Sequence, residues 1–413
     1  MPTGLGLGYR QSNIANLGVK WETQEQVNVG IDLGFFHERV NLIVDWYKKV
    51  SKDMLMSLQL PSYMGTSGNA SSALAAPMGN YGDIENKGWE ISLNTHPLIG
   101  AFEWDSDFQI SFNRNKLRAL DGTANAQIVG YGQWSDVVSV TNVGESLYNF
   151  YGYVCDGVYE DLEDLQTSAK PAKYPADGVF NRTNTVWVGD IKYKDLNGDG
   201  VIDENDRTNI GSPLPKFTFG WTNTFRYKNF DLSLFINGSY GNKVFNYLGM
   251  KLTHMNSPWS NQLNTVLDRA QIVPIDPNKD YSAGVVVNGV TIYNWYDDIT
   301  NVRVANAGAT IPRASIQDPN DNDRISDRYI EDGSYIRLKN ITLGYTFPGK
   351  IIKKWGLDNL RVYANIQNLL TITGYSGYDP EIGASTASAN VYGLDNGRYP
   401  SPTVYSFGLN VSF

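Results

Sequence analysis

The sequence has few of the residues from which catalytic and metal sites are usually built. It contains a single cysteine, Cys155, so no internal disulfide can form, and without a partner triad this thiol is interpreted as buried or incidental. The three histidines, His37, His96 and His254, lie far apart in the chain, so we expect neither a zinc site nor a catalytic site from them. We therefore predict that the protein is not an enzyme and that it needs no cofactor for chemistry.

The chain also lacks an excess of positive charge, long apolar runs and an export signal. A net charge of -9 provides no surface for binding phosphate backbones, so nucleic acid is not expected as a partner. No stretch of 18 apolar residues is present that would form a membrane-spanning helix. Met1 is followed directly by polar, glycine-rich sequence. If the protein is exported, its front end is expected to lie outside this sequence.

What the sequence does contain is many aromatic residues and glycines in a regular pattern. Aromatic residues make up 13% of the chain, with 26 Tyr, and there are 40 Gly, a mixture typical of twisted strands and turns. Between Thr403 and Phe413, large apolar residues alternate strictly with small polar ones. Because every second residue of a strand points to the same face, this segment predicts a strand with one apolar and one polar face. Composition and period together favour an all-β protein.

Nine segments show this alternation, and most are about as long as a tilted strand that crosses a bilayer. They are residues 26–35, 39–46, 89–94, 102–112, 217–227, 230–240, 335–347, 360–366 and 403–413. Short connections join eight of them into four predicted antiparallel hairpins. The alternation slips near Lys339 and Asn340, where we expect one inserted residue, a β-bulge.

The connections between these segments are alternately short and long. The long ones lie between Lys49 and Asn80, across 117–213, across 242–332 and after Tyr375. Transmembrane barrels have short periplasmic turns and longer extracellular loops, so the long connections are predicted to be extracellular and the C-terminus periplasmic. A soluble β-sandwich or propeller would also show alternating strands. The bulky apolar face and the aromatic residues near strand ends favour an antiparallel transmembrane β-barrel.

One segment of the connection 117–213 has the spacing of a calcium-binding loop. Its oxygen ligands would be Asp195, Asn197, Asp199, the carbonyl of Val201, Asp203 and Asp206. Gly200 stands at the sharp turn, and oxygen ligands at these intervals suit Ca²⁺. The alternative is a turn rich in Asp and Asn that needs no ion. Because the flanking residues do not predict helices, an isolated structural Ca²⁺ loop is expected rather than a helix–loop–helix pair.

A second acidic cluster consists of Asp318, Asn320, Asp321 and Asp323. It lacks the turn glycine and the ligand spacing of a calcium loop. We therefore interpret it as a solvated loop rather than a metal site.

Several aromatic residues fall in the predicted extracellular loops. They are Tyr131, Trp134, Trp187, Trp259, Trp295 and Tyr296. Exposed rings of this kind can stack on sugars or on apolar peptide side chains, so these residues are candidates for substrate binding. Packing within the loops, or contact with a partner over the barrel mouth, is the alternative. The pattern does not identify the substrate.

Several segments resemble the starch-utilisation-system C (SusC/RagA) family of TonB-dependent outer-membrane transporters of Bacteroidetes. They are LGVKWET at 17–23, NYGDIENKGWEISL at 80–93, GYVCDGVY at 152–159, GDIKYKDLNGDGVIDENDRTNIG at 189–211, residues 213–227, DGSYIRLKNITLGYTF at 332–347, NIQNLLTITGY at 365–375 and the terminal Phe413. The resemblance rests on the order and spacing of these segments over essentially the whole chain.

This resemblance implies a fold, a location and partners. The fold would be a 22-stranded barrel with a plug in its lumen, in the outer membrane of a Gram-negative, Bacteroidetes-like cell. Residues 1–413 would be the C-terminal portion of that barrel, with the plug domain absent. The TonB complex would act through the missing N-terminal part, and a SusD-like surface lipoprotein would close the mouth.

The function implied by the resemblance is import of a nutrient, either an oligosaccharide or a peptide. A different class of function is compatible with the same residues, namely a surface adhesin or glycan-binding β-barrel module without transport. In that alternative the calcium loop and the loop aromatics would form the working site.

Overall fold

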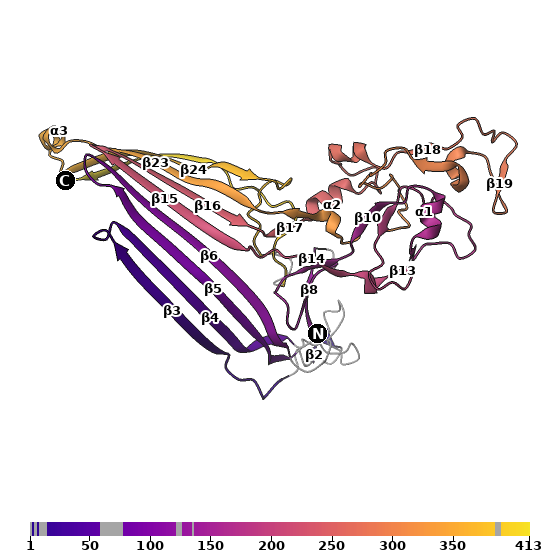
Figure 1. Cartoon of the computed structure of the whole chain (residues 1–413), viewed down its shortest axis with the longest axis horizontal. Helices are drawn as coiled ribbons and strands as arrows, with labels where there is room; N and C mark the ends of the chain where they lie inside the picture. The colour runs from indigo at the N-terminus through magenta and orange to yellow at the C-terminus, as the bar shows by residue number, and fades with distance from the viewer. Residues whose placement is uncertain are drawn as a thin grey trace.

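The computed structural model describes residues 2–3, 6–7, 15–57, 77–120, 126–133, 136–384 and 390–413. Within them, nine strands form one long, curved antiparallel sheet, and a smaller body lies at one end of it (Figure 1). The strands of the sheet are β3 (Thr23–Phe35), β4 (Val40–Ser57), β5 (Met78–Leu98), β6 (Phe102–Leu120), β15 (Phe217–Tyr227), β16 (Phe230–Tyr240), β23 (Tyr335–Thr346), β24 (Asn359–Thr373) and β26 (Val404–Ser412). The predicted nine-strand antiparallel sheet is confirmed.

Each strand of the sheet pairs with the previous and the next of these strands along the chain, in the order β26-β24-β23-β16-β15-β6-β5-β4-β3. The short connections 36–39, 99–101, 228–229 and 347–358 lie at the end of the sheet where the C-terminus is found (Figure 1). The last of them contains α3 (Gly349–Ile352) and η7 (Lys353–Trp355). The long connections all return at the opposite end.

The register shifts at several places in the sheet, and two of these shifts bear on the predicted strands. The expected bulge is present, because the pairing of β16 with β23 shifts between Phe235 and Ile236, where Lys339 is the extra residue. The segment 89–94 was expected to end before a short connection to 102–112, but β5 continues to Leu98 through a register shift after Thr95. The end of this strand was missed because Pro97 favours a turn, whereas proline is also tolerated at a bulge.

The apolar residues of the strands form one continuous face. One register row contains Leu98, Trp104, Phe225, Leu232, Leu343, Ala364 and Phe407. An adjacent row on the opposite face contains Asp105, Thr224, Ser233, Thr342, Asn365 and Ser406. On the apolar face Phe407 is 84% exposed, which is unusual for a large hydrophobic side chain in water. Such a face suits contact with lipid.

Aromatic side chains pair at both ends of the apolar face. Phe230 and Tyr345 lie 4.7 Å apart, centroid to centroid, near the short connections. Phe217 and Tyr240 lie 5.1 Å apart near the long connections. Rings at these two levels match the aromatic girdles that mark the two membrane interfaces of a transmembrane barrel. In the described part of the chain, no helix has the length and apolar character needed to cross a membrane.

Three of the long connections fold together into the body beyond the sheet, which we call the cap. The cap consists of residues 126–216, 241–334 and 374–403, as far as they are described. The first contributes β7 (Gln127–Tyr131), β8 (Val137–Asn142), β9 (Phe150–Gly152), β10 (Cys155–Val158), α1 (Leu162–Thr167), β11 (Lys170–Pro171), β12 (Ile191–Tyr193), β13 (Val201–Ile202), η2 (Glu204–Asp206) and β14 (Thr208–Gly211). The second contributes β17 (Lys243–Asn246), α2 (Tyr247–Thr253), η3 (Asn264–Asp268), β18 (Ile272–Pro274), β19 (Val285–Val287), β20 (Val290–Ile292), η4 (Trp295–Asp297), η5 (Ile299–Asn301), β21 (Val302–Val304), η6 (Asp327–Tyr329) and β22 (Ile330–Asp332). The third contributes β25 (Leu394–Asp395), while β1 (Pro2–Thr3) and β2 (Gly6–Leu7) form a separate pair near the N-terminus.

Among the described residues, β3 and β26 each pair with one neighbour and form the two edges of the sheet. We predict that these 413 residues, expressed alone, will not form a stable monomeric barrel in a membrane. Each unpaired backbone group at a lipid-exposed edge costs on the order of several kcal/mol. Migration in detergent gels before and after heating tests this prediction. A folded, protease-resistant monomer that shifts on heating would show it to be wrong.

Candidate functional site

The cap has hydrophobic cores of its own, and each joins different connections. One core contains Trp187 and Ile191 from the first connection together with Ile299 and Val302 from the second. Another joins all three, with Phe150 from the first, Phe245 and Tyr247 from the second, and Leu394 from the third. The long connections were expected as extracellular loops, and the structure shows that they pack as one body. A body of this kind can hold a binding site in a defined geometry.

A buried ion pair links the first two connections inside the cap. Asp190 is fully buried, and its Oδ1 lies 2.8 Å from Nε of Arg313. The second guanidinium contact, from Nη2 to Oδ2, is 3.2 Å and satisfies hydrogen-bond geometry, whereas the Nε contact does not. Oδ2 also accepts a hydrogen bond from the backbone N–H of Trp187. Burial raises the pKa of Asp190, and Arg313 opposes that effect.

The second acidic cluster was expected to be a solvated loop, but much of it is buried and Asp321 is its exposed member. Asp318, Asn320 and Asn322 are all more than nine-tenths buried. Asn322 Oδ1 accepts the backbone N–H of Ile191 at 2.7 Å, and its Nδ2 donates to Asp190 at 3.1 Å. The side-chain amides therefore provide the hydrogen bonds that a buried strand end needs. Acidic and amide residues are usually exposed, so sequence alone favoured solvent, and the partners lie more than a hundred residues away.

His254 joins this turn, which sequence separation had not indicated. Its Nε2 lies 2.9 Å from Asp318 Oδ2, and its Nδ1 lies 3.0 Å from Asp323 Oδ2. Within the described residues, this is the one group of at least three His, Cys, Asp or Glu side chains whose ligand atoms lie within 4.8 Å of one another. Both ring nitrogens face a carboxylate, an arrangement that suits a doubly donating imidazolium. Burial alone would lower the pKa of His254, but the two carboxylates raise it to about 9.

We therefore predict that the turn 318–323 loosens as the pH rises. The pKa of His254 is above its ordinary value of 6.5, so the stabilisation is complete below pH 6.5 and is lost as the pH rises through about 9. We expect an effect of about 2 kcal/mol, allowing for some solvent screening. Amide hydrogen exchange of the turn between pH 6 and pH 10 measures it. The substitution His254→Gln should flatten the profile, whereas His37→Gln, in the turn after β3, should not. An unchanged wild-type profile over this range would contradict the prediction.

The predicted calcium loop lies on the cap surface and is closed by its own hydrogen bonds. Asp195 accepts the backbone N–H groups of Gly198 at 2.6 Å and Gly200 at 2.8 Å. Asp206 is fully buried and accepts the N–H groups of Leu196 at 2.9 Å and Asp203 at 2.8 Å. The turn is therefore formed by side-chain to backbone bonds, while carboxylate oxygens still have lone pairs to offer an ion. Both interpretations of this loop stay open.

The predicted substrate-binding aromatics have different surroundings. Trp187, Trp295 and Tyr296 come together at the outer part of the cap, whereas Tyr131 lies in β7 and Trp259 is 93% exposed elsewhere. Trp187 was expected to be an exposed loop residue and is only 1% exposed, because it fills the core between the two connections. Trp134 lies outside the described residues.

Two cavities lie in this part of the cap, one of them lined by Trp187 and Tyr296, and sequence analysis did not find their polar residues. One has a volume of about 450 Å³ and is lined by Arg182, Arg269 and Arg313 with Trp187 and Tyr296. The other has a volume of about 390 Å³ and also includes Arg182. The three arginines are far apart in sequence and belong to no motif. No local signal identifies them, because the folding of two connections onto each other brings them together.

The apolar sheet face, the aromatic levels and the cap at the side of the long connections define an outer-membrane β-barrel chain. Comparison with known proteins assigns its family. The model of the family "TonB dependent receptor-like, beta-barrel" matches residues 1–237, more than half of the chain, and the chain belongs to this family.

Curated relatives agree with this assignment. "TonB-dependent receptor P3" of Formosa agariphila is 33% identical over 97% of this chain and 35% of its own length. "TonB-dependent receptor SusC" of Bacteroides thetaiotaomicron is 27% identical over 96% of this chain and 32% of its own length. The chain thus spans about a third of the length of these relatives. The resemblance to SusC/RagA proteins predicted from the sequence is confirmed.

A solved structure has the same fold. "Structure of the RagAB peptide transporter" aligns with 100% of this chain and 38% of its own, at a TM-score of 0.69 and 20% sequence identity. At this identity the likeness supports the fold and says nothing of what is bound.

Proposed function

We propose that these nine strands work as part of a TonB-dependent outer-membrane transporter that imports a nutrient. The observation that carries the proposal is the continuous apolar face of the sheet, with short turns on one side and a packed cap on the other. A lipid-facing sheet with a structured extracellular mouth suits selective passage. In the proposed arrangement further strands pair with the edges β3 and β26 and close a 22-stranded barrel around a plug.

The cap provides a surface for a partner at the barrel mouth. We propose that a SusD-like surface lipoprotein closes over the cap, and that the TonB complex opens the plug from the periplasmic side. The names of the relatives and of the RagAB structure support this arrangement. The cargo is proposed to be an oligosaccharide or a peptide.

Uptake by cells tests the proposal. Cells that carry the full-length gene should lose growth on one class of oligosaccharide or peptide when the gene is deleted. A protonophore should abolish uptake of the same labelled nutrient, because TonB-dependent opening needs the proton-motive force. The lipoprotein should co-purify with the receptor from detergent extracts. Unaltered growth on every nutrient of the panel would overturn the proposal.

The alternative function, a surface adhesin or glycan-binding barrel, makes a different prediction. An adhesin would retain labelled glycan on the cell surface, and this retention would be the same with and without a protonophore. The apolar face is equally compatible with this function. Ligand binding in the cap cavities would support the adhesin only if the bound ligand stays at the cell surface and is not taken up.

We also propose that residues 195–206 bind a structural Ca²⁺ at the cell surface. The spacing of Asp195, Asn197, Asp199, Val201, Asp203 and Asp206 supports the proposal, as does their place on the cap, since extracellular calcium is plentiful. Positive φ angles of 77° at Gly198 and 83° at Gly200 let the chain turn tightly around the ligand oxygens.

Asp199→Ala is expected to remove calcium binding without affecting the sheet. A site with a dissociation constant of about 0.1–1 mM would be filled outside the cell. The ion would then order the loop by only about 1 kcal/mol near tenfold saturation. Calorimetry with millimolar calcium, together with proteolysis of the loop with and without chelator, measures the effect. Asp177→Ala, which alters an exposed aspartate of the same connection, is the control. If the wild type gives no heat and chelator changes nothing, the loop is only a turn.

A further inference from the structure

The larger of the two cap cavities, which we call the arginine cavity, collects positive charge in an acidic chain. Its lining includes Arg182, Trp187, Arg269, Gln271, Tyr296 and Arg313. None of the residues lining it is an aspartate or glutamate, although the chain has a net charge of -9. Ile272 and Val273 of β18 line the cavity, and this strand lies in the part of the cap away from the sheet (Figure 1). A concave surface with three guanidinium groups attracts anions.

The three arginines differ in how far their charge is already balanced. Arg313 is paired with buried Asp190. Arg182 is 39% exposed and contacts Asp297 at 3.0 Å. Arg269 has no carboxylate within 4.0 Å among the described residues, and its Nη1 has only a long contact of 3.4 Å to the carbonyl of Val266. Its fork of N–H donors is therefore available to a ligand.

A second observation points to a ligand in the same place. The indole Nε1 of Trp187 is buried and has no hydrogen-bond partner, and this side chain lines the arginine cavity. Buried donors are rarely left without an acceptor, and such exceptions often mark functional sites. A small movement of the cavity wall would let a bound oxyanion accept from this group.

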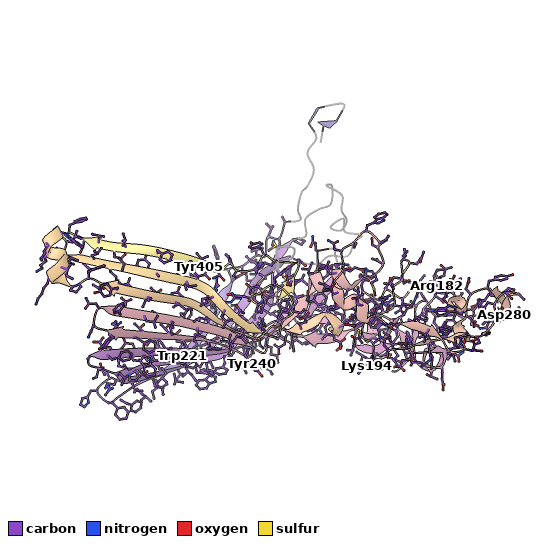
Figure 2. All side chains as sticks on the ribbon, turned by 90° about the horizontal axis from the view of Figure 1, so that it is seen from above. Arg182, Lys194, Trp221, Tyr240, Asp280 and Tyr405 are labelled. Carbon is purple, nitrogen blue, oxygen red and sulfur yellow. The ribbon has the colours of Figure 1, made fainter. Side chains whose placement is uncertain are left out.

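The smaller cavity, which we call the amide cavity, shares Arg182 with the first. Its neutral polar lining comes from Asn181, Thr183, Asn288, Thr291 and Asn294. Amides and hydroxyls both donate and accept hydrogen bonds, as the hydroxyls of a sugar do. Arg182 lies over the ring of Tyr296, 5.1 Å from its centroid, and Figure 2 shows Arg182 in the cap, far from the sheet residues Trp221 and Tyr405. This stacked pair therefore lies where the charged arginine cavity meets the neutral, polar amide cavity.

We propose that the two cavities together bind an acidic saccharide. The oxyanion of one sugar lies in the arginine cavity, where Arg269 and Arg182 bind it, and a neutral, hydroxyl-bearing sugar lies in the amide cavity. As a statement about cargo the inference rests on the proposed import function, whereas the binding site itself does not depend on it. Volumes of about 450 and 390 Å³ suit one sugar each.

Titration of the assembled barrel in detergent with small probes tests the site. The signal is tryptophan fluorescence, since Trp187 lines the arginine cavity and Trp295 packs against Tyr296, which also lines it. Glucuronate and glucose 6-sulfate are the carboxylate and sulfate probes, and the tighter of them identifies the oxyanion. We expect glucose to bind at least tenfold more weakly than the better acid. We also expect Arg269→Gln to weaken binding of that acid at least tenfold, and Arg269→Lys to restore part of it.

The matched control is Arg303→Gln, which removes an exposed arginine of β21 that lines neither cavity. It should leave binding unchanged. Absence of binding by both acidic sugars, or equal affinity of the wild type and Arg269→Gln, would overturn the site. Tighter binding of a glutamate-containing dipeptide than of either sugar would overturn the saccharide assignment. If binding holds but cells do not import an acidic oligosaccharide, the site stands and the cargo assignment falls.

Discussion

Asp190→Ala is expected to destabilise the cap by about 3–5 kcal/mol, because it leaves the guanidinium of Arg313 buried and unpaired. Asp190 is fully buried and Arg313 is only 6% exposed, so water cannot replace the lost carboxylate. The backbone N–H of Trp187 and the amide of Asn322 would lose an acceptor in the same step. Denaturant unfolding of the cap, followed by tryptophan fluorescence, measures the change.

The matched control removes both charges together. In the double variant Asp190→Leu with Arg313→Met, two apolar side chains replace the pair, and such replacements are often close to neutral. We therefore expect the double variant to cost clearly less than Asp190→Ala alone. If the single and double variants are equally unstable, the cost does not come from an unpaired buried charge.

Leu234→Arg is expected to destabilise the assembled barrel by about 2–4 kcal/mol, the cost of an arginine near the bilayer midplane on the lipid face. Leu234 lies near the middle of β16, and its partner on β23 is Ile341 on the apolar face. An unfolding titration of the barrel in lipid vesicles measures the loss. The guanidinium would have to lose its hydration in the hydrocarbon, or it would pull the strand toward an interface.

The neighbouring residue is the natural control for this substitution. Ser233 points to the opposite face, between Thr224 of β15 and Thr342 of β23. An arginine at this position would lie in the lumen, so Ser233→Arg should change stability little. Equal losses for the two substitutions would show that the assignment of the two faces is wrong.

The strands could be predicted from the sequence because alternation with a period of two is a local signal. The limits of β15 and β16 were predicted to the residue, and the bulge at Lys339 followed from a slip in the same pattern. The prediction missed the parts of β4 and β5 that lie next to the long connections. In these parts Lys48 pairs with Lys87 on the face that is apolar elsewhere in the strands. The strand pairing therefore continues beyond the apolar band, where the residues no longer alternate between apolar and polar.

The cap could not be predicted in the same way, because its contacts join residues far apart in the chain. Ser139 donates to the carbonyl of Asn390, 251 residues away. Arg337 of β23 is 3% exposed and binds Asp379 at 2.5 Å, which holds the third connection against the sheet. Each of these residues looks like an ordinary polar loop or strand residue in the sequence. Their roles arise only when three connections fold together.

Cys155 makes a direct test of the central claim practical. This single cysteine is largely buried, and burial raises the pKa of its thiol to about 11, so it should react slowly with maleimides at neutral pH. A cysteine introduced elsewhere can therefore be labelled selectively.

The most direct measurement is a fluorescence scan along β16 in lipid vesicles that contain the assembled barrel. Single cysteines replace residues 231 to 237 in turn, each carries an environment-sensitive probe, and quenchers are placed either in the lipid tails or in water. Leu232, Leu234 and Ile236 lie on the apolar face, and Asp231, Ser233 and Phe235 on the other. We predict quenching by lipid at the first three and by the aqueous quencher at Asp231 and Ser233, with a period of two. Quenching by water alone at every position, or no alternation, would contradict the claim that this sheet is the wall of a membrane barrel.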